Sequence, residues 1–155
     1  MIGIGVQLGE PEQRDSPIDR MLMKAMSVTD QLRDPNYNDG TEAWINPIFI
    51  VPGSMWQPEF EGYEYGHFSK KQKGLVIKIA VPKSVARGKG IPEFISTSLR
   101  DAVHMASEFF SAKGISFSTL KAEKIILAIE AGLEEVMALV IGRERADGDG
   151  EGESR

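Results

Sequence analysis

The chain of 155 residues contains no cysteine. Without thiols it forms no disulfide bonds and no thiolate metal sites, and it has no cysteine nucleophile. No segment approaches the roughly 18 apolar residues that a membrane-spanning helix requires. The N-terminus also lacks a basic stretch ahead of a long apolar run, so it does not read as a secretory signal. These absences predict a cytoplasmic protein without a membrane partner.

Positive charge is in deficit as well. The chain has 18 Lys and Arg against 23 Asp and Glu, a formal net charge of -5. An acidic surface repels nucleic-acid phosphates and attracts basic proteins. The basic residues gather at 70–73 and 83–89, and a strand between the two groups would hold them about 23 Å apart. We therefore expect no nucleic-acid partner.

The length and composition are those of one globular domain. Hydrophobic residues make up 41% and charged residues 26% of the chain. A domain of this size buries about two-thirds of the surface that its unfolded chain exposes. We assign residues 1–142 to a single α+β domain. Residues 143–155, RERADGDGEGESR, contain one alanine as their only apolar residue and are predicted to form a disordered acidic tail.

Alternating apolar residues or β-branched runs predict strands at residues 2–8, 43–53, 60–68 and 75–82, with a possible fifth strand at 115–118. The short polar segment 69–74 predicts that the third and fourth of these strands form a β-hairpin. Because proline lacks an N–H, Pro47 is predicted to lie at a sheet edge or a bulge.

Apolar residues three and four apart predict helices at about 17–32, 92–113 and 119–141. Ser16 is placed to cap the first helix, and Pro17 suits its first position. The fold class is therefore α+β, with a mostly antiparallel four- to five-stranded sheet and helices packed on one face.

The stretch EFEGYEYGHF has the densest group of reactive side chains. Along a strand, Tyr63, Tyr65 and His67 share one face with Glu61, whereas Glu64 points to the other. The two glutamates are therefore a poor catalytic pair. The tyrosines either pack under the helices or frame a small site with His67, and Glu64 and His67 are candidate partner contacts near the hairpin end.

The other candidate sites are incomplete. His104 pairs with Glu108 across one helical turn, as on an ordinary solvent-exposed surface. No serine lies in a nucleophile elbow, and the glycines at 3, 5 and 9 lie in a strand instead of a phosphate-binding turn. We assign no catalytic residue, cofactor or metal, and we do not expect an enzyme.

An acidic ridge follows the last helix: Glu123, Leu127, Glu130 and Glu134 recur at intervals of four, three and four. This ridge is either a solvated helix flank or a docking edge for a basic protein, with Leu127 as a small apolar contact.

Five stretches carry a resemblance to a known family: MIGIGVQLG, SPIDRMLMKAM, WINPIFIVPGS, FEGYEYGHFSKKQKGLVIKIAVP and GIPEFISTSLRDAVHMASEFFSAKGISFSTLKAEKIILAIEAGL. Over residues 1 to about 135 the chain resembles bacterial polymorphic-toxin immunity proteins of the family called immunity protein 39. The resemblance implies a non-enzymatic α+β protein that binds and neutralises a cognate toxin domain made by the same cell.

The sequence hypothesis is thus an immunity-type protein whose partner is a cognate protein toxin, and the acidic surface favours a basic one. The predicted partner contacts are the ridge together with Glu64 and His67. The alternatives are a small enzyme with a site near Tyr63, Tyr65 and His67, or a homo-oligomeric adaptor. Toxin identity, contact face and oligomeric state stay open.

Overall fold

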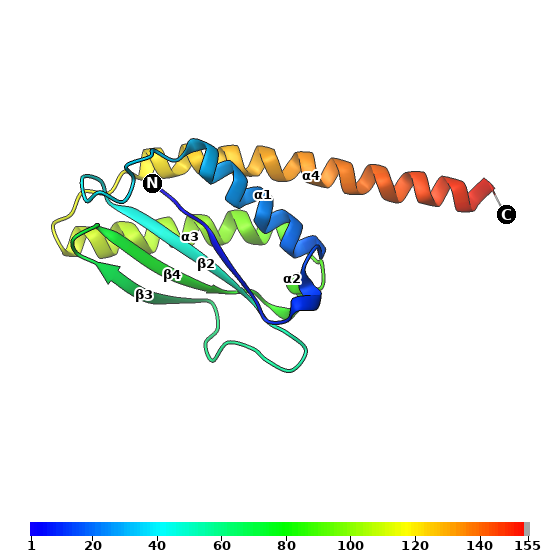
Figure 1. Cartoon of the computed structure of the whole chain (residues 1–155), viewed down its shortest axis with the longest axis horizontal. Coiled ribbons are helices and arrows are strands. Elements are labelled where there is room, and N and C mark those ends of the chain that lie inside the picture. The colour runs from blue at the N-terminus through cyan, green and yellow to red at the C-terminus, as the bar shows by residue number, and fades with distance from the viewer. Residues whose placement is uncertain (154–155) are drawn as a thin grey trace.

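The computed structural model describes the backbone of residues 1–153 and the side chains of residues 1–139. Four strands and four α-helices follow one another along the chain (Figure 1). Their order is β1 (Gly5–Leu8), the 3-10 helix η1 (Pro11–Gln13), α1 (Pro17–Leu32), β2 (Trp44–Val51), β3 (Tyr63–Ser69), β4 (Gly74–Ala80), α2 (Lys83–Ala86), α3 (Ile91–Ala112) and α4 (Thr119–Glu153).

The α+β class is confirmed, but the prediction of a mostly antiparallel sheet is wrong. The sheet has four strands in the order β1-β2-β4-β3. β1, β2 and β4 run parallel, and only β3 is antiparallel to its neighbour β4. The cause is α1, which returns the chain to the start of the sheet so that β2 runs parallel to β1. Residues 115–118 form no strand and instead connect α3 to α4.

Pro47 also lies where the sequence did not place it, because β2 is a central strand and Pro47 is buried there. The sheet accommodates the missing N–H through a gap in the pairing of the first two strands. Ile2 pairs with Ile45 and Gly5 pairs with Ile48 in the same register, while the positions between them are unpaired. The gap lies opposite Pro47, which has no hydrogen to donate.

The first helix begins as the sequence predicts. Ser16 lies just before it, and its Oγ accepts a hydrogen bond from the Asp19 N–H at 3.4 Å, while Pro17 occupies the first turn. The helix buries one face, formed by Ile18, Met21, Leu22, Ala25 and Thr29. Leu32, the last residue of the helix predicted at 17–32, is exposed because α1 ends there.

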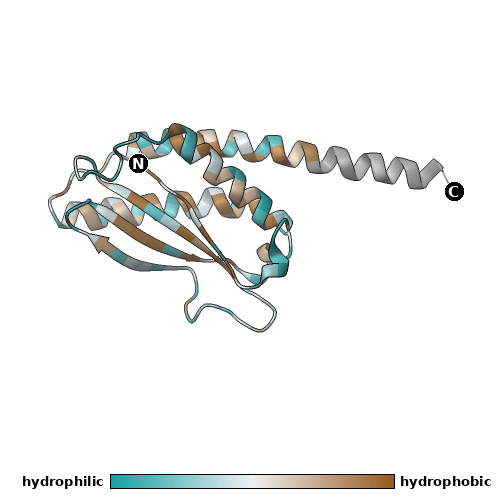
Figure 2. Cartoon of the chain, viewed as in Figure 1, coloured by the Kyte–Doolittle hydropathy of each residue, from teal (hydrophilic) through white to brown (hydrophobic). Residues whose placement is uncertain are grey.

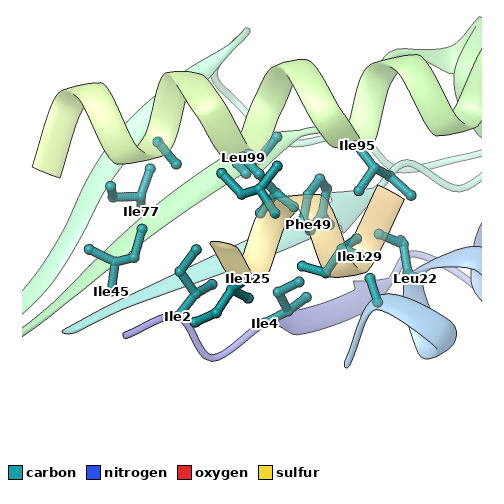
Figure 3. Packing of buried hydrophobic residues seen from close by; sticks show 14 of the residues in the cluster. Ile2, Ile4, Leu22, Ile45, Phe49, Ile77, Ile95, Leu99, Ile125 and Ile129 are labelled. Carbon is teal, nitrogen blue, oxygen red and sulfur yellow. The ribbon is translucent and has the colours of Figure 1, made fainter. Parts of the chain in front are cut away.

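A single hydrophobic core joins the sheet to α1, α3 and α4, which cover one of its faces (Figure 3). The sheet contributes Ile45, Phe49 and Ile77. The apolar stripe predicted for α3 is confirmed, and α4 contributes the face that the sequence indicates; their buried residues include Ile95, Leu99, Ala102, Ala106, Phe110, Ala122, Ile125, Ile126, Ile129 and Leu133. Figure 2 shows hydrophobic residues concentrated along β2 and β4.

Among the helices in the described part of the chain, none combines the length and apolarity needed to cross a membrane. The described backbone continues α4 as far as Glu153, beyond the helix end that the sequence predicts at about residue 141. The side chains of residues 143–155 lie outside the described ones, and the disorder of this acidic tail stays a prediction.

Candidate protein-binding site

Three loops meet at one edge of the sheet. Because β1, β2 and β4 are parallel, their carboxyl ends lie together: Leu8 pairs with Val51, and Ile50 pairs with Ala80. The segments that follow these strands, residues 9–16, 52–62 and 81–90, are called the strand-end loops. In open sheets with parallel strands, this edge is where ligands usually bind. Figure 1 shows the loop between β2 and β3 extending away from the long helices.

Two glycines let the first two strand-end loops approach closely. A Cβ on Gly9 would lie 2.4 Å from the backbone nitrogen of Gly53. A Cβ on Gly53 would in turn lie 2.6 Å from Cγ of Glu10. These positions therefore require glycine for the close approach, which brings Glu10 against the loop after β2.

Glu10 anchors this second loop. Its carboxylate accepts hydrogen bonds from the backbone N–H and the Oγ of Ser54. Both bonds hold the pKa of Glu10 below its ordinary value, and the bond from the Ser54 side chain contributes most. Gln13 adds a second tie, since its side-chain N–H donates to the carbonyl oxygen of Pro52 at 2.6 Å. The loop thus starts from a fixed base.

Two large apolar side chains occupy the tip of the anchored loop. Met55 is 96% exposed and Trp56 is 44% exposed. The turn that presents them is closed by the Gly53 N–H, which donates to the Trp56 carbonyl oxygen at 2.8 Å. Trp and Met are enriched at protein interfaces, and tryptophan is among the residues that most often dominate binding energy. The tip has the composition of a partner contact.

Three hollows surround the tip. One of about 210 Å³ is lined by Gln13, Ser54, Lys83 and Arg87 among others. A second of about 320 Å³ lies beside Met55 and Trp56, and a third of about 750 Å³ lies between residues 57–62 and the end of β4. Lys83 lines all three, so the hollows are neighbours, and the smallest of them is also lined by Arg87.

Glu10→Ala is expected to loosen the loop, because it removes the Oε1 atom that accepts both Ser54 hydrogen bonds. Hydrogen exchange of the Ser54 amide should then become faster, while exchange in the core strands stays unchanged. Glu12→Ala is the matched control, since Glu12 is exposed in the short helix η1 that directly follows Glu10. Equal Ser54 exchange in both variants would show that Glu10 is not the anchor.

The tyrosines of EFEGYEYGHF lie at the rim of the core. Strand β3 begins at Tyr63, and a bulge lies between Tyr65 and Phe68. The alternation predicted for residues 60–68 is therefore wrong after Tyr65: both Tyr65 and Phe68 contact the ring of Phe109, with ring centroids 5.4 and 5.1 Å apart. Tyr65 is 45% exposed, and its hydroxyl donates to the Met105 carbonyl oxygen at 3.2 Å. The sequence analysis offered two interpretations, tyrosines packed under the helices or tyrosines framing a site with His67. Neither places Tyr65 half-exposed against α3.

Tyr63 is half-buried, and its hydroxyl donates to the carboxylate of Asp101. Burial and then the bond to Asp101 raise the pKa of Tyr63 to about 12. The folded state therefore keeps this proton at a pH where the unfolded state loses it, and stability should fall as pH rises from about 10 to about 12. In an ultraviolet titration, Tyr63→Phe should remove an ionisation step with a pKa of about 12. If that step remains in the variant, the assignment to Tyr63 fails.

Glu64 and His67 lie on β3, an edge strand, and both are exposed. Glu64 is paired across the sheet with Lys78, and His67 falls within the bulge. The predicted pair of His104 and Glu108 is confirmed, with the Nε2 and Oε1 atoms 3.2 Å apart at an exposed position. Within the described side chains, no group of three or more His, Asp or Glu is arranged to hold a metal ion.

The acidic ridge is partly engaged within the protein. Glu123 and Glu130 both form ion pairs with Arg100 of α3, and the Arg100 Nη2 atom lies 2.8 Å from Glu130 Oε1. Both carboxylates raise the pKa of Arg100, and the hydrogen bond to Glu123 contributes most. Ser96 adds a hydrogen bond from its Oγ to Glu130 at 2.7 Å. Half of the ridge therefore joins α4 to α3.

The rest of the ridge faces solvent. Leu127 is 55% exposed, and Glu134 is exposed. Arg100 pairs with two of the three carboxylates, and its single positive charge cancels one of their negative charges. The ridge therefore offers a basic partner less free negative charge than its sequence suggests. Its role as a partner contact stays a prediction.

Sequence reasoning missed the strand-end loops. The sequence does contain a signal for them: two large apolar residues, Met55 and Trp56, lie between Pro52 and Pro58. The prolines indicate a loop, and loops run over the protein surface. The contribution of Lys83 depends on the parallel pairing of β2 with β4, which only the fold reveals. Comparison with known proteins finds no matching family model, no matching curated protein and no matching solved structure.

Proposed function

We propose that the chain is an immunity-type protein that binds a bacterial toxin domain in the cytoplasm and neutralises it by direct association. The observation that carries this proposal is the loop tip, where Met55 and Trp56 are presented to solvent from a base fixed by Glu10. The resemblance of residues 1 to about 135 to immunity proteins supplies the class of partner.

The anchoring supports a binding function on energetic grounds. A loop that is ordered before it meets its partner loses less conformational entropy on binding than a mobile loop does. Ser54, Gly53 and Gln13 provide that order through side-chain and backbone hydrogen bonds at the base of the tip. A Trp anchor beside neighbouring hollows also matches how interface energy concentrates at a few buried aromatic contacts.

The two alternatives draw less support from the geometry. A small enzyme would need Tyr63, Tyr65 and His67 to converge, but the hydroxyls of both tyrosines are bonded to α3, and no hydrogen bond among the described residues joins either of them to His67. A strand-pairing adaptor would use the β3 edge, where a bulge and the charge of Glu64 oppose pairing with a second chain.

Co-expression with the protein encoded by the neighbouring upstream gene, where we expect a toxin domain, tests the proposal. The two proteins should purify together as a stable complex, and the double variant Met55→Ala, Trp56→Ala should lose the toxin while remaining folded. Met23→Ala is the control, because Met23 is an exposed methionine on α1. The variants Glu64→Ala, His67→Ala and Glu134→Gln test the contacts predicted from the sequence. A toxin that never co-purifies with the unmodified chain would refute the proposal.

A further inference from the structure

The strand-end loops hold a local positive charge on an acidic protein. Lys83 and Arg87 are both exposed and line the same hollow of about 210 Å³. Among the described side chains neither forms a salt bridge, whereas Arg33, Arg100 and Lys121 each do. The net charge of the whole chain is -5, yet the described side chains that line this hollow include two cations and no carboxylate.

Among the described side chains, no carboxylate lines the two smaller hollows. Glu10 is bound to Ser54 and lines neither of the two smaller hollows. Glu59 and Glu61 line only the largest hollow, on the side of residues 57–62. The two smaller hollows therefore present positive charge without negative charge in their walls.

The positive charge lies directly beside the apolar tip. The hollow at Met55 and Trp56 and the hollow at Arg87 have Lys83, Gly53 and Ser54 in common. One short segment of a partner can therefore contact both at once, with a charged group in one hollow and an apolar group in the next.

We propose that the partner docks an acidic-apolar segment here: a carboxylate enters the hollow between Lys83 and Arg87, and a neighbouring apolar side chain packs on Met55 and Trp56. This inference rests on the proposed function and names the chemistry of the partner's contact. It differs from the expectation drawn from net charge, since the contact recognises acidic rather than basic groups.

A display library of short random peptides tests the inference without the toxin. Peptides selected on the unmodified chain should be enriched in Asp or Glu next to Leu, Phe or Trp. Their affinity should fall about tenfold or more in Lys83→Glu and in Trp56→Ala, and it should weaken as salt rises. Lys71→Glu is the matched control, because it makes the same charge change in the β3–β4 turn at the other end of β4.

Enrichment of basic peptides, an absence of enriched peptides, or equal binding by Lys83→Glu and Lys71→Glu would each overturn the inference. The melting temperature of Lys83→Glu, compared with that of the unmodified chain, checks that this variant is folded. If the peptides fail while the toxin still co-purifies, only the docking chemistry is wrong; if the peptides bind as expected and no toxin does, only the proposed function is wrong.

Discussion

Leu99→Ala is expected to lower the free energy of unfolding by about 2–5 kcal/mol. Leu99 is fully buried at the centre of α3, where it packs in the cluster that joins the sheet to the three long helices (Figure 3). Removing its isobutyl group leaves a cavity that neighbours such as Phe49 and Ile95 cannot fill without moving. Urea denaturation followed by circular dichroism measures the loss.

His104→Ala serves as the comparison on the same helix. His104 is exposed and bonded only to Glu108, so its removal should change the free energy of unfolding by less than about 0.5 kcal/mol. If the two substitutions cost the same, the face of α3 that packs on the sheet has been assigned wrongly.

Trp56→Ala is expected to weaken partner binding by about 2–4 kcal/mol, which is about thirtyfold or more in the dissociation constant. The reason is that Trp56 has the largest side chain on the anchored loop, is 44% exposed and has no intramolecular aromatic partner among the described side chains. Surface plasmon resonance with immobilised toxin domain gives the rates, and most of the change should appear in dissociation.

Leu120→Ala is a suitable control for that measurement, since Leu120 is 67% exposed at the start of α4, far along the chain from the strand-end loops. Melting temperatures of both variants should match that of the unmodified protein. Unchanged binding by a folded Trp56→Ala protein would remove the loop tip from the interface.

The helices follow from the sequence because their signal is local. Ser16 and Pro17 mark the start of α1, and the spacing of Ile95, Leu99 and Ala102 is that of a buried helical face. These patterns depend on neighbours within a few turns of the same helix, so they can be read without knowledge of the fold.

The sheet could not be read so directly, because strand direction depends on contacts between distant segments. The hairpin of β3 and β4 was foreseen, but the parallel pairing of β2 with β4 joins residues that the intervening β3 separates in sequence. Pro47 then suggested an edge position, whereas the gap opposite it allows a central one. A strand-helix-strand succession was the available clue to the parallel arrangement.

The candidate site was missed for the same reason. Glu10, Ser54 and Lys83 lie far apart along the chain, and only the shared edge of three parallel strands brings them together. The ridge was found because it repeats along one helix, but its engagement by Arg100 depends on how α3 packs against α4. Sequence patterns locate side chains on an element, and the fold decides which of them are free.

Titration of a purified toxin domain with this chain tests the central claim most directly. If the chain neutralises by association, toxin activity should fall in proportion to added chain and reach zero near an equimolar ratio, and it should return when the complex is dissociated. Met55→Ala, Trp56→Ala should need a large excess to reach the same inhibition. Full toxin activity in the presence of excess chain, or irreversible loss of activity at a small fraction of the equimolar amount, would contradict the claim, the second result because it would indicate a catalytic modification of the toxin.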